Sequence, residues 1–127
     1  MRNSLKILIA DRNRHVRDLL HREFAAAGYQ VRVAKDGREV MNISNEEAPA
    51  LFILDSELPF LAELEVLRRL RERYPRIPVV IHSFATPEYG GLTDEKSIVF
   101  VEKKGDTGRL KTVVAEVIGD MRTGVSI

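Results

Sequence analysis

The chain has no cysteine and no long apolar run, and these two absences exclude several classes of protein. Without cysteine, neither a disulfide framework nor a thiolate metal site can form. No stretch reaches the roughly 20 apolar residues of a membrane-spanning helix, and residues 1–6 lack the apolar segment of a secretory signal peptide. Repeats, low-complexity segments and linkers are also missing, so we expect a cytoplasmic protein without membrane contact. We predict one domain over residues 1–127, with its core at about residues 5–121.

An excess of charge of one sign is lacking as well. The 127 residues include 20 basic and 19 acidic side chains, which leaves a net charge of +1. Such a balance gives no general attraction to a polyanion, so we expect no nucleic-acid binding by this domain. The three histidines do not have the spacing of metal ligands. The hydrophobic fraction of 44% is nevertheless enough for a buried core.

The apolar residues that are present form short segments typical of β-strands. Residues 51–54 are four apolar residues in succession, and the run stops at Asp55. A continuous run of this length is typical of a strand covered by helices on both faces of a parallel sheet. By contrast, Val31 and Val33 alternate with polar residues, which predicts a half-exposed strand at a sheet edge. The predicted strands are residues 5–10, 29–34, 51–55, 78–83 and 98–101.

Helical patterns occupy the segments between these strands. Asn13 is a suitable N-cap for the first helix, and Gly28 is placed to close it at the C′ position. Asp36-Gly37 is a turn signal before the second helix. The weakest helical pattern is residues 84–96, which contain proline and two adjacent glycines. The clearer helices are predicted at residues 14–27, 38–44, 61–74 and 110–121.

Regular alternation of strands and helices predicts the fold class α/β. Parallel strands joined by right-handed helical crossovers give a sheet with helices on both faces. Five such strands are typical of a flavodoxin-like three-layer α/β/α sandwich, with a five-stranded parallel sheet in the order 2-1-3-4-5. The functional site of such a fold lies at the carboxyl ends of its strands.

Four polar residues follow different predicted strands at that edge: Asp11, Asp55, Ser83 and Lys103. A pair of carboxylates suits a hard cation such as Mg²⁺, which binds one or two carboxylates and keeps several waters. A carboxylate can also act as a nucleophile toward phosphorus. Ammonium and hydroxyl groups can bind phosphoryl oxygens. The set is therefore suited to phosphoryl transfer onto Asp55.

In this order and spacing, the chain resembles the receiver domains of two-component response regulators, the CheY-like family. The resemblance implies that Asp55 is the phosphoacceptor and that Lys103 is the phosphate counter-ion. It implies that Ser83 and Phe100 are the switch residues that report phosphorylation. It also implies a Mg²⁺ site at Asp11, Asp55 and Glu57. The resemblance covers roughly residues 5–121 and is carried by residues 7–11, 28–29, 34–37, 54–55, 58–59, 78–83 and 100–103.

The same resemblance implies the partners of the domain. A histidine kinase or a phosphotransfer protein would supply the phosphoryl group. A downstream effector domain or protein would recognise the switched surface, and a homodimer is a further expectation. A domain of this kind is a phosphoacceptor or binding module rather than a turnover enzyme.

Arg12 and Phe84 are two of the residues that depart from the family pattern. Arg12 stands where the family usually carries a second metal-binding acid, and its guanidinium would repel a cation or pair with Asp55. The Glu57 side chain could partly replace that carboxylate, and we expect reduced Mg²⁺ affinity. Phe84 follows the switch hydroxyl, where a small residue is usual, and would narrow the opening for a phosphodonor. The alternative hypothesis is a degenerate pseudo-receiver, which binds its partner without phosphorylation.

Enzymatic alternatives fit the sequence less well. A flavodoxin would need a phosphate loop rich in Ser, Thr and Gly after the first strand, where this chain has Asp-Arg-Asn-Arg at residues 11–14. A dehalogenase-type phosphatase carries Asp-x-Asp at the end of its first strand. Here the similar Asp55-Ser56-Glu57 follows the third strand.

Overall fold

Five parallel strands form a single sheet in the order β2-β1-β3-β4-β5, as the sequence predicts. The computed structural model describes residues 5–58, 63–84, 98–104 and 106–123. The strands are β1 (Lys6–Ala10), β2 (Gln30–Ala34), β3 (Leu51–Asp55), β4 (Val79–Ser83) and β5 (Ile98–Glu102). The helices are α1 (Arg14–Ala26), α2 (Gly37–Glu46), α3 (Glu63–Arg73) and α4 (Gly108–Thr123).

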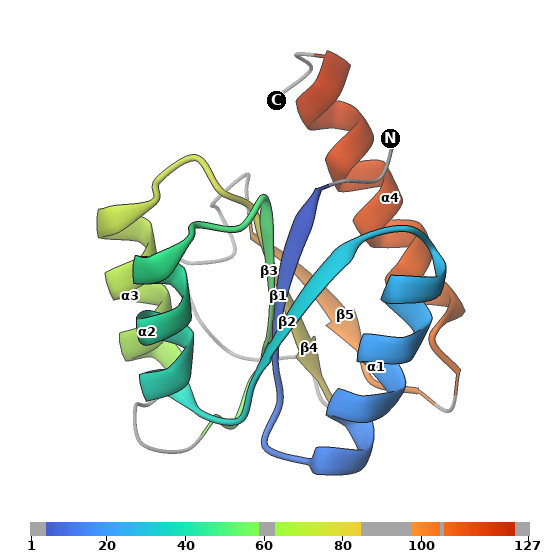
Figure 1. The fold of residues 1–127 in the computed structure, drawn as a ribbon, viewed down its shortest axis with the longest axis horizontal. Coiled ribbons are helices and arrows are strands. Elements are labelled where there is room, and N and C mark those ends of the chain that lie inside the picture. Colours follow the sequence, from blue (N-terminus) through green and yellow to red (C-terminus); the bar gives the residue numbers. More distant parts are fainter. Residues whose placement is uncertain (1–4, 59–62, 85–97, 105, 124–127) are drawn as a thin grey trace.

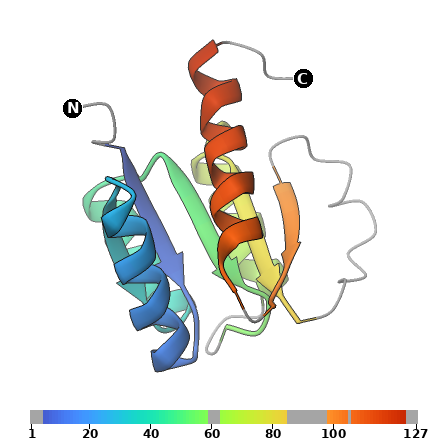
Figure 2. The same cartoon turned by 90° about the vertical axis from the view of Figure 1, so that its right-hand side faces the viewer.

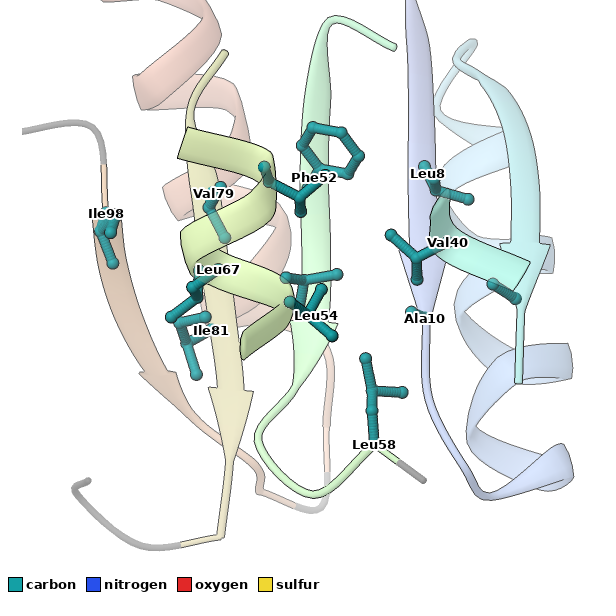
Figure 3. Close-up of a cluster of buried hydrophobic side chains, with 13 residues drawn as sticks. Leu8, Ala10, Val40, Phe52, Leu54, Leu58, Leu67, Val79, Ile81 and Ile98 are labelled. Atoms are coloured by element: carbon teal, nitrogen blue, oxygen red, sulfur yellow. The ribbon is translucent and has the colours of Figure 1, made fainter. Parts of the chain in front are cut away.

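The sheet is the middle of three layers. Helices α2 and α3 cover one face and α1 and α4 cover the other (Figure 1). Alternate residues of β3 divide between the two cores, because successive side chains of a strand point to opposite faces. Phe52 and Leu54 pack on the α2–α3 side (Figure 3), whereas Leu51 and Ile53 pack on the α1–α4 side. All residues of β3 are buried, as the apolar run predicts.

The strands end together at one edge of the sheet. In Figure 2 the arrowheads of β1, β3, β4 and β5 point to the same end of the molecule. The register explains this alignment: Ala10 pairs with Leu54, and Asp55 pairs with His82. The residues that follow β1, β3 and β5 therefore converge from distant parts of the sequence.

The predicted caps of the first helix are confirmed. The side chain of Asn13 accepts hydrogen bonds from the backbone of His15 at 2.8 Å and of Val16 at 3.2 Å, which satisfies free donors of the first turn. Gly28 has a φ of 102°, a left-handed conformation that glycine adopts without a Cβ clash.

The segment at Asp36 differs from its prediction. Instead of only forming a turn, Asp36 is the N-cap of α2, and its side chain accepts from the Glu39 backbone at 2.9 Å. The Glu39 side chain in return accepts from the Lys35 backbone at 2.8 Å. These two bonds fix the start of α2 at Gly37, and the helix is longer at both ends than the predicted 38–44.

The remaining elements agree with the sequence apart from their ends. Strand β2 lies at a sheet edge, where Val33 is 36% exposed. Helix α4 begins before the predicted Leu110. Leu61 and residues 85–96 lie outside the described residues. The weak helix at residues 84–96 therefore remains a prediction. In the part of the chain that the structure describes, no helix is long and apolar enough to span a bilayer.

Candidate functional site

Three of the predicted site residues meet at the carboxyl edge of the sheet. Asp11 follows β1, Asp55 ends β3 and Lys103 follows β5. The Lys103 Nζ lies 2.9 Å from Asp11 Oδ2 and 3.1 Å from Asp55 Oδ1. Its contact with Asp11 is an ion pair without the angle of a directed hydrogen bond. All three side chains are buried: Asp11 is 1% exposed, Asp55 2% and Lys103 6%.

Backbone groups fix the two carboxylates. The Asn13 N–H donates to Asp11 Oδ1 at 2.9 Å. The Glu57 N–H donates to Asp55 Oδ1 at 3.2 Å, and the Arg12 N–H donates to Asp55 Oδ2 at 3.1 Å. Hydrogen bonds from fixed donors stabilise the ionised form of a carboxylate. The loops after β1 and β3 thus hold the acids in place by main-chain contacts.

Arg12 lies on the solvent-exposed side of Asp55 and binds Glu57. Its NH1 donates to Glu57 Oε1 at 2.5 Å, and its Nε lies 3.8 Å from Asp55 Oδ2. The hydrogen bond to Glu57 is the main reason that the pKa of Arg12 is raised. Arg12 therefore approaches Asp55 as expected, but its stronger partner is the Glu57 carboxylate. The Glu57 carboxylate is therefore already paired with the Arg12 guanidinium.

Burial shifts the pKa values of Asp11 and of the neighbouring His82. It raises the pKa of Asp11, with the charge of Asp55 adding to the effect and Lys103 opposing it. Burial, together with the charge of Lys103, lowers the pKa of His82 to about 4, and the charge of Asp55 opposes this shift. His82 is 8% exposed and pairs with Asp55 across the β3–β4 ladder. A neutral imidazole is therefore buried beside the acids.

The two predicted switch residues lie on β4 and β5. Ser83 is buried at the end of β4, where its hydroxyl accepts from Ser56 Oγ at 2.9 Å and its carbonyl accepts from Lys103 N at 2.6 Å. Phe100 is half-buried against the α2–α3 core. Ser83 is therefore connected to Ser56, the neighbour of Asp55, and to the backbone of Lys103.

Phe84 is exposed at the mouth of the site. Two thirds of its surface is accessible (66%), although it is a large apolar residue. Its ring centroid lies 5.0 Å from the Lys103 Nζ, within the range of a cation–π contact. The phenyl group thus covers part of the lysine that binds both acids.

The residues at this edge have the donor chemistry of a Mg²⁺ site. Two carboxylates, from Asp11 and Asp55, face a common lysine, and Mg²⁺ prefers oxygen ligands of this type. The Glu57 side chain, which the sequence suggests as a partial replacement for the missing carboxylate, is bound to Arg12. Among the described residues, no group of three His, Cys, Asp or Glu side chains is arranged for a metal. Two side-chain ligands with waters therefore fit better than three.

A parallel 2-1-3-4-5 sheet with two aspartates and a lysine at its strand ends defines a receiver-type α/β domain. The family model of the response regulator receiver domain matches residues 7–115, and the chain belongs to this family.

Curated relatives include the response regulators MprA. The protein from Mycolicibacterium vanbaalenii is 36% identical over 77 residues, which are 61% of this chain and 33% of that protein. MprA from Mycobacterium tuberculosis H37Rv is 36% identical over 78 residues, 61% of this chain and 34% of that protein. The chain matches only about a third of the length of these relatives.

Solved structures agree on the fold. The response regulator TrrA of Thermotoga maritima, in complex with Mg²⁺–BeF, has a TM-score of 0.80 at 25% identity, over 89% of this chain and 98% of that one. The chemotaxis protein CheY4 of Vibrio cholerae has a TM-score of 0.81 at 20% identity, over 91% and 99%. At 20% identity the second likeness supports the fold alone.

Several contacts around the site were not predicted from the sequence. Ser56 binds Ser83, and the Arg17 NH1 donates to the carbonyl of Asp11 at 2.8 Å. The place of His82 beside Asp55 in the β3–β4 ladder was not predicted either. A signal for His82 was available, because strand alternation places it on the same face as Val80. The other two contacts depend on loop geometry.

Proposed function

We propose that Asp55 accepts a phosphoryl group from a phosphohistidine of a histidine kinase or phosphotransfer protein. One observation carries the proposal: the Asp55 carboxylate is fixed at a strand end with Lys103 on Oδ1 and the Arg12 N–H on Oδ2. A nucleophilic carboxylate needs a fixed direction of attack and nearby cations for the charge of the phosphoryl group. Family membership supports the same role.

Phosphoryl transfer to Asp55 forms one P–O bond and breaks one P–N bond. An Asp55 carboxylate oxygen attacks phosphorus, and the P–N bond of the phosphohistidine breaks. The bonding electron pair returns to the imidazole nitrogen of the donor, while a new P–O bond forms an acyl phosphate on Asp55. Lys103 stabilises the charge that spreads over the phosphoryl oxygens.

Asp11 and Asp55 would hold Mg²⁺, with the main-chain carbonyl of Glu57 as a further ligand, and the ion would supply charge neutralisation at the phosphoryl group. TrrA, in complex with Mg²⁺–BeF, supports this assignment. Burial raises the pKa of Asp11, and a bound cation would favour its ionised form.

Phosphorylation would be reported through Ser83 and Phe100. The Ser83 hydroxyl can donate to a phosphoryl oxygen, and its strand is paired with β5, which carries Phe100. A shift of Ser83 would therefore change the packing of Phe100 against the α2–α3 core. The changed surface would bind an effector domain or a separate effector protein.

Mass spectrometry tests the phosphoacceptor. The protein is incubated with acetyl phosphate and Mg²⁺, and intact mass is recorded for wild type, Asp55→Asn and Asp18→Asn, an exposed control on α1. We expect one phosphoryl group on wild type and on Asp18→Asn, and none on Asp55→Asn. Because the Phe84 ring lies over the Lys103 ammonium, Phe84→Ala is tested in parallel. Absence of the group from both wild type and Phe84→Ala would contradict the proposal.

The pseudo-receiver is the second candidate, and the Arg12 contacts with Glu57 and Asp55 are the observation in its favour. In that function the ion pairs hold the domain in one state, and a partner binds without phosphorylation. It predicts that Asp55→Asn leaves partner binding unchanged. The mass measurement separates the two functions, because only the first predicts a label that Asp55→Asn loses.

A further inference from the structure

We propose that Arg12 is a phosphoryl-binding residue of this site. Its guanidinium would leave Glu57 and donate to the anionic oxygens of a phosphoryl group on Asp55. Arg12 would then carry part of the charge neutralisation otherwise left to Mg²⁺, and phosphoryl binding would depend less on the metal. This inference rests on the proposed function, since it adds a residue and a metal dependence to the same site.

The position of Arg12 relative to the Asp55 oxygens is the first support. Lys103 lies 3.1 Å from Oδ1, whereas Arg12 Nε lies 3.8 Å from Oδ2 and its backbone N–H donates to the same oxygen at 3.1 Å. The Asp55 carboxylate therefore has one cation beside each oxygen. A P–O bond formed at Oδ2 would add three phosphoryl oxygens, which share a charge of about −2, next to the guanidinium.

The present partner of Arg12 is one that a phosphoryl group can replace. The Arg12 and Glu57 side chains are 43% and 58% exposed, and exposed ion pairs contribute little because water competes with them. A phosphoryl group carries more charge than a carboxylate and matches the planar fork of a guanidinium. Exchange of Glu57 for the phosphoryl oxygens is thus favoured by charge and geometry.

The backbone at Arg12 is already fixed, so the exchange needs only side-chain rotation. Arg17 NH1 donates to the Asp11 carbonyl at 2.8 Å and to the Arg12 carbonyl at 3.3 Å. Asn13 caps α1 and its N–H binds Asp11. The loop therefore holds the Arg12 Cα near Asp55 while its guanidinium chooses between two anions.

Beryllofluoride, a mimic of a phosphoryl group on aspartate, is the probe for this role. Its affinity is measured by ¹⁹F NMR with and without Mg²⁺ for wild type, Arg12→Ala and Glu57→Gln. Arg14→Ala is the matched control, because it removes the same charge from an 80% exposed side chain whose partner is Asp18. Amide spectra verify that each variant is folded.

We expect metal-free binding by wild type and a loss on the order of tenfold in Arg12→Ala, as for one charge-assisted hydrogen bond. Adding Mg²⁺ should reduce that loss. Glu57→Gln should tighten metal-free binding, because it frees the guanidinium, and Arg14→Ala should match wild type.

Two results distinguish failure of this inference from failure of the proposed function. Mg²⁺-dependent binding that Asp55→Asn abolishes, with equal affinities for wild type and Arg12→Ala at every Mg²⁺ concentration, would overturn the Arg12 role alone. Equal losses in Arg12→Ala and Arg14→Ala would also overturn it, because they would indicate a general charge effect. Absence of Asp55-dependent binding in every variant with Mg²⁺ would contradict the proposed function itself.

Discussion

The Asp55 carboxylate has a cation on each side, and the two cations differ in burial: Lys103 is buried, whereas Arg12 is exposed. We call the buried side of the site its inner half and the exposed side its outer half. The inner half is Asp11, Asp55, His82 and Lys103, all buried. The outer half is Arg12 and Glu57, both exposed. A buried charge without a partner is costly, whereas an exposed one is solvated by water. We infer that the inner half is a fixed part of the fold and that the outer half can exchange partners.

Removing the inner cation should have the largest effect. Lys103→Met leaves Asp11 and Asp55 buried side by side without their common partner, and breaking such a pair costs about 3–5 kcal/mol. Urea unfolding at neutral pH measures the loss. Lys104→Met is the control, because that neighbour is 66% exposed. Equal stability of the two variants would contradict the structural role of the buried ion pairs.

Acidification should destabilise the inner half through His82. Its pKa is about 4 in the folded protein and 6.5 when unperturbed, so between these values the unfolded chain binds the extra proton. Stability therefore falls as the pH decreases from 6.5 to about 4. Between about pH 7 and about pH 5 the His82 contribution is about 2 kcal/mol.

His82→Gln should remove this part of the pH dependence, while the exposed His21→Gln should not. Asp11, whose pKa is raised, has the opposite sign and loses stability as the pH rises through its folded pKa. Because that term is present in both variants, the difference between their unfolding curves isolates His82. Identical pH dependence in the two variants would contradict a neutral buried imidazole.

The Ser56–Ser83 hydrogen bond joins the loop of the outer half to β4. Ser56→Ala removes a half-buried bond of 2.9 Å, and we expect a loss of about 1 kcal/mol. A double-mutant cycle with Ser83→Ala measures the coupling between the two hydroxyl groups. Additive losses would show that the hydroxyl contact contributes nothing to stability.

The outer ion pair should have the smallest effect on folding. Glu57→Gln breaks the contact with Arg12, and we expect an unchanged urea midpoint because both side chains are exposed. The same variant should alter anion binding, as proposed above. A clear shift of the midpoint would show that the outer half, like the inner half, belongs to the fixed structure.

The sequence predicts the inner half better than the outer half, for a physical reason. Buried strands have a strong apolar pattern, and parallel strands end at one edge, so Asp11, Asp55 and Lys103 could be brought together from the sequence. The strand order was predictable from the alternation of strands and helices. The Asn13 cap was predictable because asparagine stands directly before a helical pattern.

The partner of Arg12 was not predictable in this way. Its sequence position suggested repulsion of a cation or a pairing with Asp55, whereas the structure adds a closer bond to Glu57. Loop conformation decides between such partners, and local patterns do not encode it strongly. The same applies to Arg17, whose contacts with two loop carbonyls have no signature in residue spacing.

The most direct test of the central claim is to locate the phosphoryl group in the chain. After incubation with a phosphodonor and Mg²⁺, borohydride reduces an acyl phosphate on aspartate to homoserine, and peptide mass spectrometry identifies the modified position. We predict homoserine at position 55, in the peptide that contains β3, and none at Asp11. Modification elsewhere, or none in both wild type and Phe84→Ala, would contradict the assignment of Asp55 as the phosphoacceptor.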